Sequence, residues 1–473
     1  MSEEFGQTTL SPIGAAVLLP LLAAVLTMSR HFAVAAFLAA VCFVSDGQRL
    51  SIAGLDFTPI RMLIAVGALR VLARSEYSQL KWQTIDSMFV CYVFWGYAAY
   101  ALRYEFEFSA LVRRAGEMYT YTGTYFLCRC WLRNGDDVAA FAKAFAILAI
   151  PSGLFFAAEW MTGRNIFSIF GGVPEITGTR DGRLRCRGPF PHAILAGCFW
   201  AGACPLIASL LWRKTSDRLI ALAGLAGAML VIASCASSTP LLALAAMIFA
   251  AGLYRVRGQL RAIQIGVIVA LVVIHFARTK PVWHLLGRIN VVGGSTGHHR
   301  YLLIDNAIKH FDEWGLVGTK ATAHWGHQMF DVTNQFLLEG VRGGIVAMLL
   351  FTTVLLLAFR KIGGAVRHDK RRPSDFATWL VGSALFGHSA IFFSVAYFGQ
   401  VPVIFWSTLA AAVAVASGSR VGRPNGAAMY RMVYPVLQPG VSAGCLVPAF
   451  PLQRGVGAGP ILQVRSRRNR WSK

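Results

Sequence analysis

The stretch AILAGCFWAGACPLIASLL, residues 193–211, contains no charged side chain and is followed almost at once by Arg213 and Lys214. Its length matches the roughly 20 helical residues that cross a hydrocarbon core of about 30 Å. Basic residues directly after such a run are typical of the cytoplasmic end of a membrane span. The stretch therefore predicts a transmembrane helix, and the rest of the chain repeats its pattern.

The composition of the whole chain supports a membrane protein. Of 473 residues, 56% are apolar and 14% are charged, whereas a soluble domain carries about 25% charged residues. Further apolar runs lie near residues 58–72, 85–102, 118–132, 138–160, 219–233, 241–253, 263–276, 335–359, 376–396 and 401–416. Two short runs, 12–28 and 32–44, fit either a tight hairpin of two spans or a re-entrant pair. We expect an all-α, polytopic transmembrane helix bundle of about 12–13 spans.

The net charge is +23, and clusters of Lys and Arg occupy short loops between the apolar runs, at 213–218, 255–261 and 360–372. Short basic loops are typical of the cytoplasmic side. A nucleic-acid reader would instead gather its cations on one folded face, so we expect no nucleic-acid partner. By alternation, the long polar stretches 162–191 and 277–333 are predicted to be two large extracytoplasmic loops.

The chain is divided into two regions. Residues 1–416 are expected to form one transmembrane domain, and residues 417–473 contain Gly, Pro and Arg but neither Asp nor Glu. Such a segment cannot bury a core, so we expect a disordered, basic, cytoplasmic tail in contact with anionic lipid. Glu3 and Glu4 argue against a cleavable signal peptide. The nine cysteines indicate neither a disulfide framework nor a metal site.

Three polar clusters are predicted to lie near the extracytoplasmic side. The first, Arg185 to His192, places Arg185, Arg187 and His192 around a Gly-Pro-Phe-Pro turn that stiffens the entry to the span at 193. The arginines either bind an anion or extend to lipid headgroups, as arginines that flank spans commonly do.

The second cluster is GGSTGHHRY, residues 293–301, followed by the apolar period of an amphipathic helix on the membrane surface. Arg300 is expected in the first turn of that helix. A helix N-terminus with an arginine suits a diphosphate. The Lys-Ser/Thr ending of a P-loop is missing, so this turn is not a P-loop.

The third cluster is HWGHQMFDVTNQFLLEGVRGG, residues 324–344, which leads directly into a span. Asn334, Gln335 and Glu339 cannot all face lipid at tolerable cost. Their spacing on a helix lets them line one wall of a cavity. His327 and Asp331 stand just before this helix and complete the candidate site.

Taken together, the clusters resemble the bacterial superfamily of O-antigen ligases and O-antigen or exopolysaccharide polymerases. The similarity lies in the Arg-x-x-Gly-Pro-Phe-x-His-like segment at 185–192, in Arg300, in the Asn-x-Phe-Leu-x-x-Gly-x-x-Gly-Gly-like segment at 334–344, and in the turn at 397–400. The resemblance implies a GT-C-like bundle in the bacterial inner membrane. It also implies a metal-independent, inverting transfer of glycan from a polyprenyl-diphosphate carrier to an acceptor hydroxyl, without a cofactor.

The resemblance also implies roles for single residues. His327, Asp331 and Asn334 would be catalytic, and the diphosphate and substrate would be bound by Arg185, Arg187, His192, Arg300, Thr333 and Glu339. Ligases carry a histidine directly before the asparagine, where this chain has Thr333, so a polymerase is favoured over a ligase. The expected partners are a polyprenyl-diphosphate-linked oligosaccharide, membrane lipids and other polysaccharide assembly proteins.

A lipid-linked glycan flippase or another polytopic transporter is the alternative, and a non-catalytic assembly scaffold is a third reading. Transporters place ionisable residues near the middle of the bilayer. His388 is the clearest candidate of that kind, and a lone histidine in an apolar helix is more often a hydrogen-bonded packing residue. The polar residues gather instead near the predicted external face, which favours an enzyme.

Overall fold

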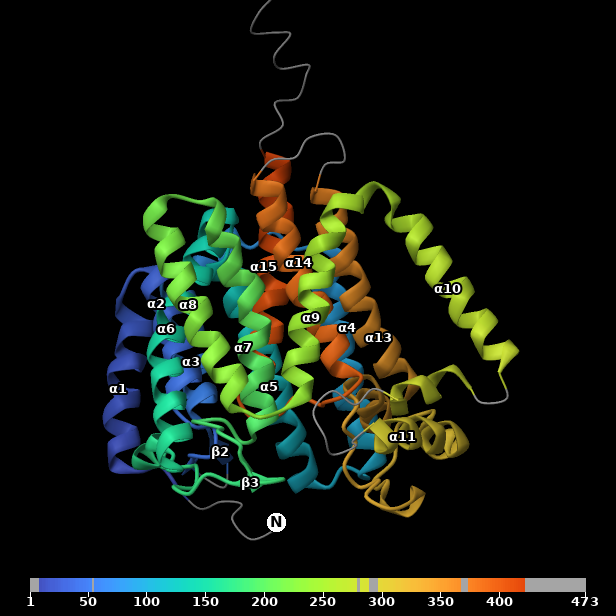
Figure 1. Ribbon diagram of the computed structural model, residues 1–473. Coiled ribbons are helices and arrows are strands. Elements are labelled where there is room, and N and C mark those ends of the chain that lie inside the picture. The colour runs from blue at the N-terminus through green and yellow to red at the C-terminus, as the bar shows by residue number, and fades with distance from the viewer. Residues whose placement is uncertain (1–7, 53–54, 279–280, 289–296, 367–372, 422–473) are drawn as a thin grey trace, which may run out of the picture. The chain divides into compact units, whose positions relative to one another are not determined.

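The computed structural model describes residues 8–52, 55–278, 281–288, 297–366 and 373–421. Most of these residues are helical, and the few strands form two short antiparallel hairpins (Figure 1). The all-α prediction is therefore confirmed for the described part of the chain. Most of the predicted tail, at 422–473, and the predicted glycine turn at 293–296 lie outside it.

Consecutive long helices run in opposite directions, so the connections between them alternate between two ends of the bundle (Figure 1). The first two helices pack against each other as an antiparallel hairpin. In chain order the long helices are α1 (Pro12–Thr27), α2 (Arg30–Phe43), α3 (Pro59–Ala73), α4 (Thr84–Arg103), α5 (Phe108–Trp131), α6 (Gly135–Thr162), α7 (Ala193–Ala208), α8 (Thr215–Ser234), α9 (Ser238–Gly252), α10 (Leu260–Ala277), α13 (Gln335–Ala365), α14 (Pro373–Phe392) and α15 (Pro402–Val421).

Six helical segments of the described residues are long and apolar enough to cross a membrane. They are Thr84–Arg103, Gly135–Thr162, Ala193–Trp212, Thr215–Ser234, Ser238–Ala277 and Gln335–Ala365. Shorter apolar helices cover Pro12–Thr27, Arg30–Phe43 and Pro402–Ser417. These helices support a polytopic membrane protein, while the number of spans and the GT-C-like arrangement stay predictions.

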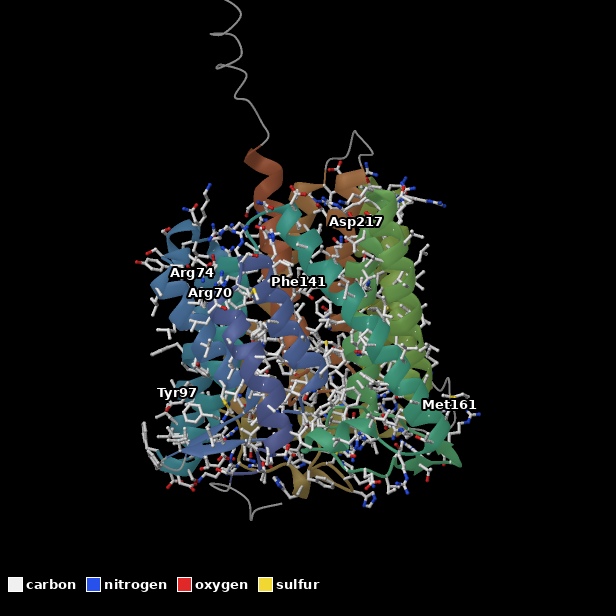
Figure 2. The ribbon with its side chains drawn as sticks, turned by 90° about the vertical axis from the view of Figure 1, so that its left-hand side faces the viewer. Arg70, Arg74, Tyr97, Phe141, Met161 and Asp217 are labelled. Atoms are coloured by element: carbon white, nitrogen blue, oxygen red, sulfur yellow. The ribbon has the colours of Figure 1, made fainter. Side chains whose placement is uncertain are left out.

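The two ends of the bundle differ in character. At one end, here named the basic end, lie the short basic connections α7–α8 and α9–α10 (Figure 1, upper end). At the other, the loop end, lie β1 (Leu50–Ile52), β2 (Leu55–Phe57), β3 (Thr179–Arg180), β4 (Arg183–Leu184), α11 (Gly297–Lys309) and α12 (Phe311–Trp314). Figure 2 shows Arg70 and Asp217 toward the basic end and Met161 toward the loop end. The two long polar stretches thus share one end, as the alternation of loops predicted.

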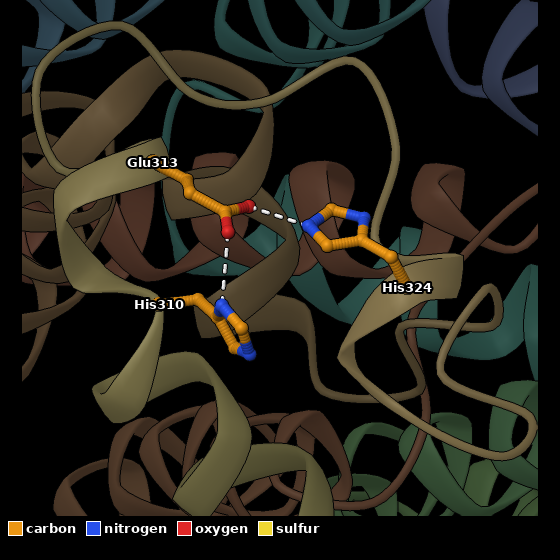
Figure 3. Close-up of side chains that lie close together, drawn as sticks. All are labelled: His310, Glu313 and His324. Atoms are coloured by element: carbon orange, nitrogen blue, oxygen red, sulfur yellow. Dashed lines mark hydrogen bonds and ion pairs between the residues drawn. The ribbon is translucent and has the colours of Figure 1, made fainter.

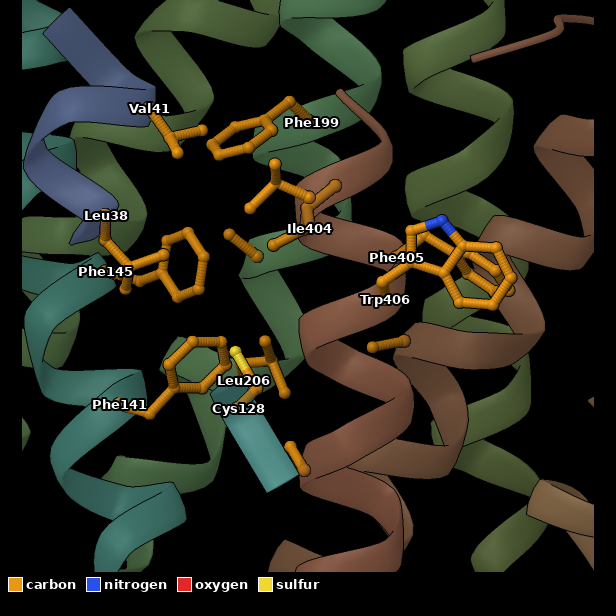
Figure 4. Packing of buried hydrophobic residues seen from close by; sticks show 14 of the residues in the cluster. Leu38, Val41, Cys128, Phe141, Phe145, Phe199, Leu206, Ile404, Phe405 and Trp406 are labelled. Carbon is orange, nitrogen blue, oxygen red and sulfur yellow. The ribbon is translucent and has the colours of Figure 1, made fainter. Parts of the chain in front are cut away.

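Small residues and aromatic rings hold the bundle together. A side chain at Gly153 of α6 would lie 2.6 Å from the Cα of Gly227 on α8, so only glycine permits this helix pair its close approach. Around α15, Phe145 and Phe199 pack with Ile404 in the apolar interior (Figure 4). Burial on every side makes α15 the central helix of the described bundle.

One long helix departs from this packing. The α10 helix consists almost entirely of apolar residues, yet none of its residues is buried. It extends away from the neighbouring helices in Figure 1 and contacts mainly the short 3-10 segments before and after it. Its apolar surface therefore faces outward along its whole length.

A buried ion pair joins α4 to α5 at the basic end. The carboxylate of Asp86 is fully buried and accepts hydrogen bonds from Arg129 Nε at 2.9 Å, from Arg129 Nη2 at 3.0 Å and from the Tyr125 hydroxyl at 2.6 Å. Because each charge is paired and hydrogen-bonded, removing one partner leaves the other uncompensated in an apolar interior.

We predict that Asp86→Asn lowers the stability of the protein by about 3–5 kcal/mol, the usual cost of breaking a buried ion pair. Thermal unfolding of the detergent-solubilised chain measures the effect as a lower midpoint. The matched control is Asp136→Asn, because Asp136 pairs with Arg213 at 2.9 Å but is largely exposed. Equal midpoints for the two variants would contradict the prediction.

Candidate functional site

A polar cavity of about 490 Å³ lies at the loop end. Its walls come from the segment between α2 and β1, from α3, α5, the start of α13, the segment before α13 and the α14–α15 turn. The polar residues that line it are Asp46, Arg61, Glu117, Thr120, Tyr121, Asp331, Arg342 and Tyr397. Acidic and basic side chains therefore line the same cavity, beside an otherwise apolar bundle.

An ion network in the wall of this cavity connects α5 to α13. Glu117 Oε2 forms ion pairs with Arg114 Nη1 at 2.7 Å and with Arg342 Nη1 at 3.2 Å. Arg114 also lies 3.8 Å from Glu339, whose other oxygen accepts a hydrogen bond from Gln335 at 2.7 Å. Gln335 and Glu339 line a small void next to the polar cavity, as predicted, whereas Asn334 is not among the residues that line either space. Glu339 is engaged by protein partners, so its predicted contact with substrate stays untested.

A break in α13 directs its first turns toward the cavity. Gly344 has a φ of +73°, and a side chain there would collide with the carbonyl of Leu316. The freed backbone groups find other partners, because Ile345 N–H donates to Gly315 O at 2.9 Å and Trp95 Nε1 donates to Gly343 O at 2.8 Å. The Gly-Gly pair of the third sequence cluster thus separates a short polar helix from the long apolar one.

The three predicted catalytic residues lie in different surroundings. Asp331 is exposed and lines the polar cavity, whereas Asn334 is buried and caps α13 by accepting a hydrogen bond from Leu337 N–H at 3.1 Å. His327 is exposed and is not among the residues that line this cavity. Thr333 is half-buried, and its hydroxyl has no hydrogen-bond partner among the described residues. Asp331 is therefore the best placed of the candidate bases.

The first sequence cluster is held in place by a buried carboxylate. Glu159, at the end of α6, is 1% exposed and accepts hydrogen bonds from Arg187 N–H at 3.1 Å, from Gly188 N–H at 2.9 Å and from the Thr177 hydroxyl at 2.8 Å. Gly188 has a φ of +54° and packs against the ring of Phe156, which excludes a side chain there. The turn that carries Arg187 is thus rigid, as predicted.

Beside this turn, His192 caps α7, and its Nδ1 accepts a hydrogen bond from Ile194 N–H at 3.3 Å. Desolvation of the ring and the nearby charges of Arg185, Arg187 and Arg180 lower the pKa of His192 to about 4. The imidazole is therefore neutral at neutral pH. The side chain of Arg187 turns back to donate to Pro191 O at 3.1 Å.

Arg300 lies in the first turn of α11, as predicted, and lines a second space of about 340 Å³ between α9 and α14. Its Nη2 donates to Thr239 Oγ1 at 3.2 Å. The other walls are mainly apolar: Leu242, Ala243, Phe386, Ala390, Ile391 and Phe393, with Ser389 and Ser394. We name this space the apolar pocket. Arg187 is not among its lining residues, so the convergence of Arg187 and Arg300 on one diphosphate stays a prediction.

The α14–α15 connection separates the two spaces. Phe393 and Ser394 line the apolar pocket, while Tyr397 and Gly399 line the polar cavity. Tyr397 is anchored at both ends, since its N–H donates to Gln335 Oε1 at 2.8 Å and its hydroxyl hydrogen-bonds to His388 Nδ1 at 2.8 Å. His388 is thus hydrogen-bonded through Nδ1, while its buried Nε2 has no hydrogen-bond partner among the described residues.

Several residues of the site escaped sequence reasoning. Arg61, Arg114, Glu117 and Tyr121 come from α3 and α5, far in the chain from α13. A signal existed, because ionisable residues that enter an apolar helix commonly mark a functional site. The same signal applies to Glu159, which lies within an apolar run.

No protein-family model, curated protein or solved structure matches the chain. A function is therefore inferred from the chemistry of the two spaces rather than from a relative.

We predict that Glu159→Gln destabilises the protein by about 1–3 kcal/mol. The NH₂ group of the glutamine would replace one of the two oxygens that accept hydrogen bonds from buried backbone N–H groups, which leaves one N–H without an acceptor. The thermal midpoint in detergent measures the change. Glu175→Gln is the matched control, since Glu175 lies on the same loop and pairs with Arg164 at the exposed surface. An unchanged midpoint in Glu159→Gln would show that this carboxylate does not hold the turn.

Proposed function

We propose that the chain is a membrane glycosyltransferase of surface polysaccharide assembly, which transfers or polymerises glycan from a polyprenyl-diphosphate carrier onto an acceptor hydroxyl. The observation that carries the proposal is the position of Arg300 in a mainly apolar pocket, one short connection away from a polar cavity. An anionic headgroup on an apolar chain is the ligand that fits such a pocket. The neighbouring polar cavity suits sugar hydroxyls.

The arginine has a chemical task in this reaction. The acceptor oxygen bonds to the anomeric carbon as the bond from that carbon to the diphosphate oxygen breaks, so negative charge develops on the leaving diphosphate. A guanidinium binds such oxygens through charge-assisted, often bidentate hydrogen bonds. Losing one preorganised donor of this kind commonly costs about 10²–10³ in rate.

Asp331 is the residue that we assign as the general base. Its carboxylate stands at the wall of the polar cavity, where it can accept the proton of the acceptor hydroxyl. Base catalysis of this kind contributes about 10²–10⁴ in rate. Asn334 would act through the helix start that it caps, and His327 would need a movement of its loop to reach the cavity.

Two observations favour a polymerase within this proposal. The position before Asn334 is Thr333, whose hydroxyl cannot replace an imidazole as a base at neutral pH. The polar cavity, at about 490 Å³, has room for sugar units of a second carrier-linked glycan. The acceptor would then be another growing chain.

The placement of the charges favours an enzyme over a transporter or flippase. The described network of Arg114, Glu117, Glu339 and Arg342 lies in the halves of α5 and α13 that are nearer the loop end. The pair Asp86 and Arg129 lies at the basic end. Transporters gather such residues near the middle of the bilayer. The candidate of that kind, His388, is hydrogen-bonded through its Nδ1 to the Tyr397 hydroxyl.

The proposed topology follows from the two ends of the bundle. The basic end would face the cytoplasm of a bacterial inner membrane, and the loop end, with both spaces, would face the opposite side. The C-terminal end of α15 lies at the basic end in Figure 1. The membrane type and the side on which the C-terminus lies belong to this proposal.

Labelling of single cysteines with a membrane-impermeant thiol reagent tests the topology. Cys91 and Cys445 are first replaced by serine, and Asp181→Cys and Ser216→Cys are then compared in intact spheroplasts. Both positions are exposed, one at the loop end and one at the basic end. We expect labelling of the first alone, because short basic loops stay inside. The reverse pattern would overturn the proposed orientation.

Arginine-to-lysine substitution tests the diphosphate contacts. A lysine keeps the charge but not the planar fork, so Arg300→Lys should lose at least about 10²-fold in long-chain glycan synthesis if the contact is bidentate. Arg187→Lys is expected to fail similarly if both arginines bind the carrier. The readout is chain length on a gel at matched membrane abundance.

Arg164→Lys is the control for this experiment, because Arg164 is an exposed loop-end arginine paired with Glu175. It should give chains of normal length. Normal chains in both Arg187→Lys and Arg300→Lys would refute the diphosphate contact, since attraction to headgroups needs only charge.

A further inference from the structure

Two histidines and a glutamate meet on the loop end, outside both the polar cavity and the apolar pocket. His310 Nδ1 lies 2.9 Å from Glu313 Oε1, and His324 Nε2 lies 2.7 Å from Glu313 Oε2 (Figure 3). One potential ligand atom from each residue lies within 4.8 Å of the others. The three side chains thus converge on one small volume at the surface.

The convergence rests on a small apolar core within the loop. Trp314 and Trp325 pack there with Leu303 and Met329. The ring of His310 stacks on that of Trp325 at 5.5 Å with an angle of 3°, so its orientation is fixed by packing. The two histidines flank a loop that returns from α12 to the 3-10 turn Ala323–Trp325.

The carboxylate is oriented by a further contact. Trp325 Nε1 donates to Glu313 Oε2 at 3.0 Å. This hydrogen bond, followed by those from His324 and His310, lowers the pKa of Glu313 to about 2. The carboxylate presents one oxygen to each imidazole. Hydrogen bonds of this kind to a ligating carboxylate are typical of the surroundings of protein metal sites.

We propose that His310, Glu313 and His324 bind a divalent transition metal ion, with Zn²⁺ as the ion that this ligand set suits. Two imidazole nitrogens and one carboxylate oxygen form a common zinc ligand set, with bonds of about 2.0–2.2 Å. Tetrahedral ligand atoms at such distances lie about 3.4 Å apart. The separations of 2.7 and 2.9 Å between nitrogen and oxygen need only small outward movements, and the two nitrogens already lie within 4.8 Å of each other.

Binding requires no change of charge on the histidines. A neutral imidazole carries its proton on either nitrogen, so each ring can turn a lone pair to the metal by adopting the other tautomer. The three protein ligands leave a fourth position for water or for an oxygen of a substrate. The exposure of His324 keeps that position accessible.

The metal would tie α12 to the turn at Ala323–Trp325. The segment after this turn carries Asp331 to the wall of the polar cavity. A bound metal would therefore fix the start of the segment that leads to Asp331. None of the three ligands lines the polar cavity itself. This inference departs from the expectation, drawn from the sequence, that the chain has no metal site.

The test measures metal content directly and is independent of any glycan assay. The full chain, purified in detergent with a tag that contains no histidine, is equilibrated with Zn²⁺, freed of unbound ion and analysed by mass spectrometry. We expect a single Zn²⁺ per chain. His324→Ala and Glu313→Gln should each retain less than about a tenth of it, because two ligands hold zinc poorly.

His284→Ala is the matched control, because His284 lies in the same loop but packs against Tyr301. It should bind Zn²⁺ like the unchanged chain. Zn²⁺ should also raise the thermal midpoint of the unchanged chain and of the control, but not that of the two ligand variants. Absence of Zn²⁺ from the unchanged chain, or full retention by His324→Ala, would overturn the proposal and leave a hydrogen-bonded surface group. Should a ligand variant unfold, the result for the unchanged chain decides.

Discussion

Glu117 forms ion pairs with two arginines, Arg114 from its own helix and Arg342 from α13. These ion pairs determine how the two helices are held together near the loop end of the bundle. An isolated charge in an apolar interior costs several kcal/mol, so the three side chains have to stay together. Their pairing holds α13 against α5 at the level where the apolar part of each helix begins. Glu117 and Arg342 also line the polar cavity, so their pairing helps to position its wall.

The same constraint explains what could be predicted from the sequence. The segregation of cations into short loops, the shared end of the two long loops, the place of Arg300 in a first turn and the common wall of Gln335 and Glu339 all follow from local patterns. Each of these predictions concerns a single segment and the free energy of placing its polar side chains in apolar surroundings. Such statements need no knowledge of which helices are neighbours.

Pairings between distant segments could not be predicted. Arg61 and Glu117 belong to the site only because α3 and α5 pack beside α13, and no pattern in a single sequence reports that contact. The group of His310, Glu313 and His324 was missed for a similar reason. Its spacing of two and then ten intervening residues matches no common zinc motif, and only the folded loop brings His324 back to the other two.

The α10 helix is joined to the rest of the protein mainly through the short 3-10 segments before and after it. It has an apolar surface and no buried residue, so its tilt in a membrane is set by the surrounding lipid more than by protein neighbours. A thicker bilayer would draw α10 upright, and a thinner one would let it lie flatter. Arg300 is held separately, by its hydrogen bond to Thr239 of α9, so the apolar pocket keeps its arginine whatever tilt α10 adopts.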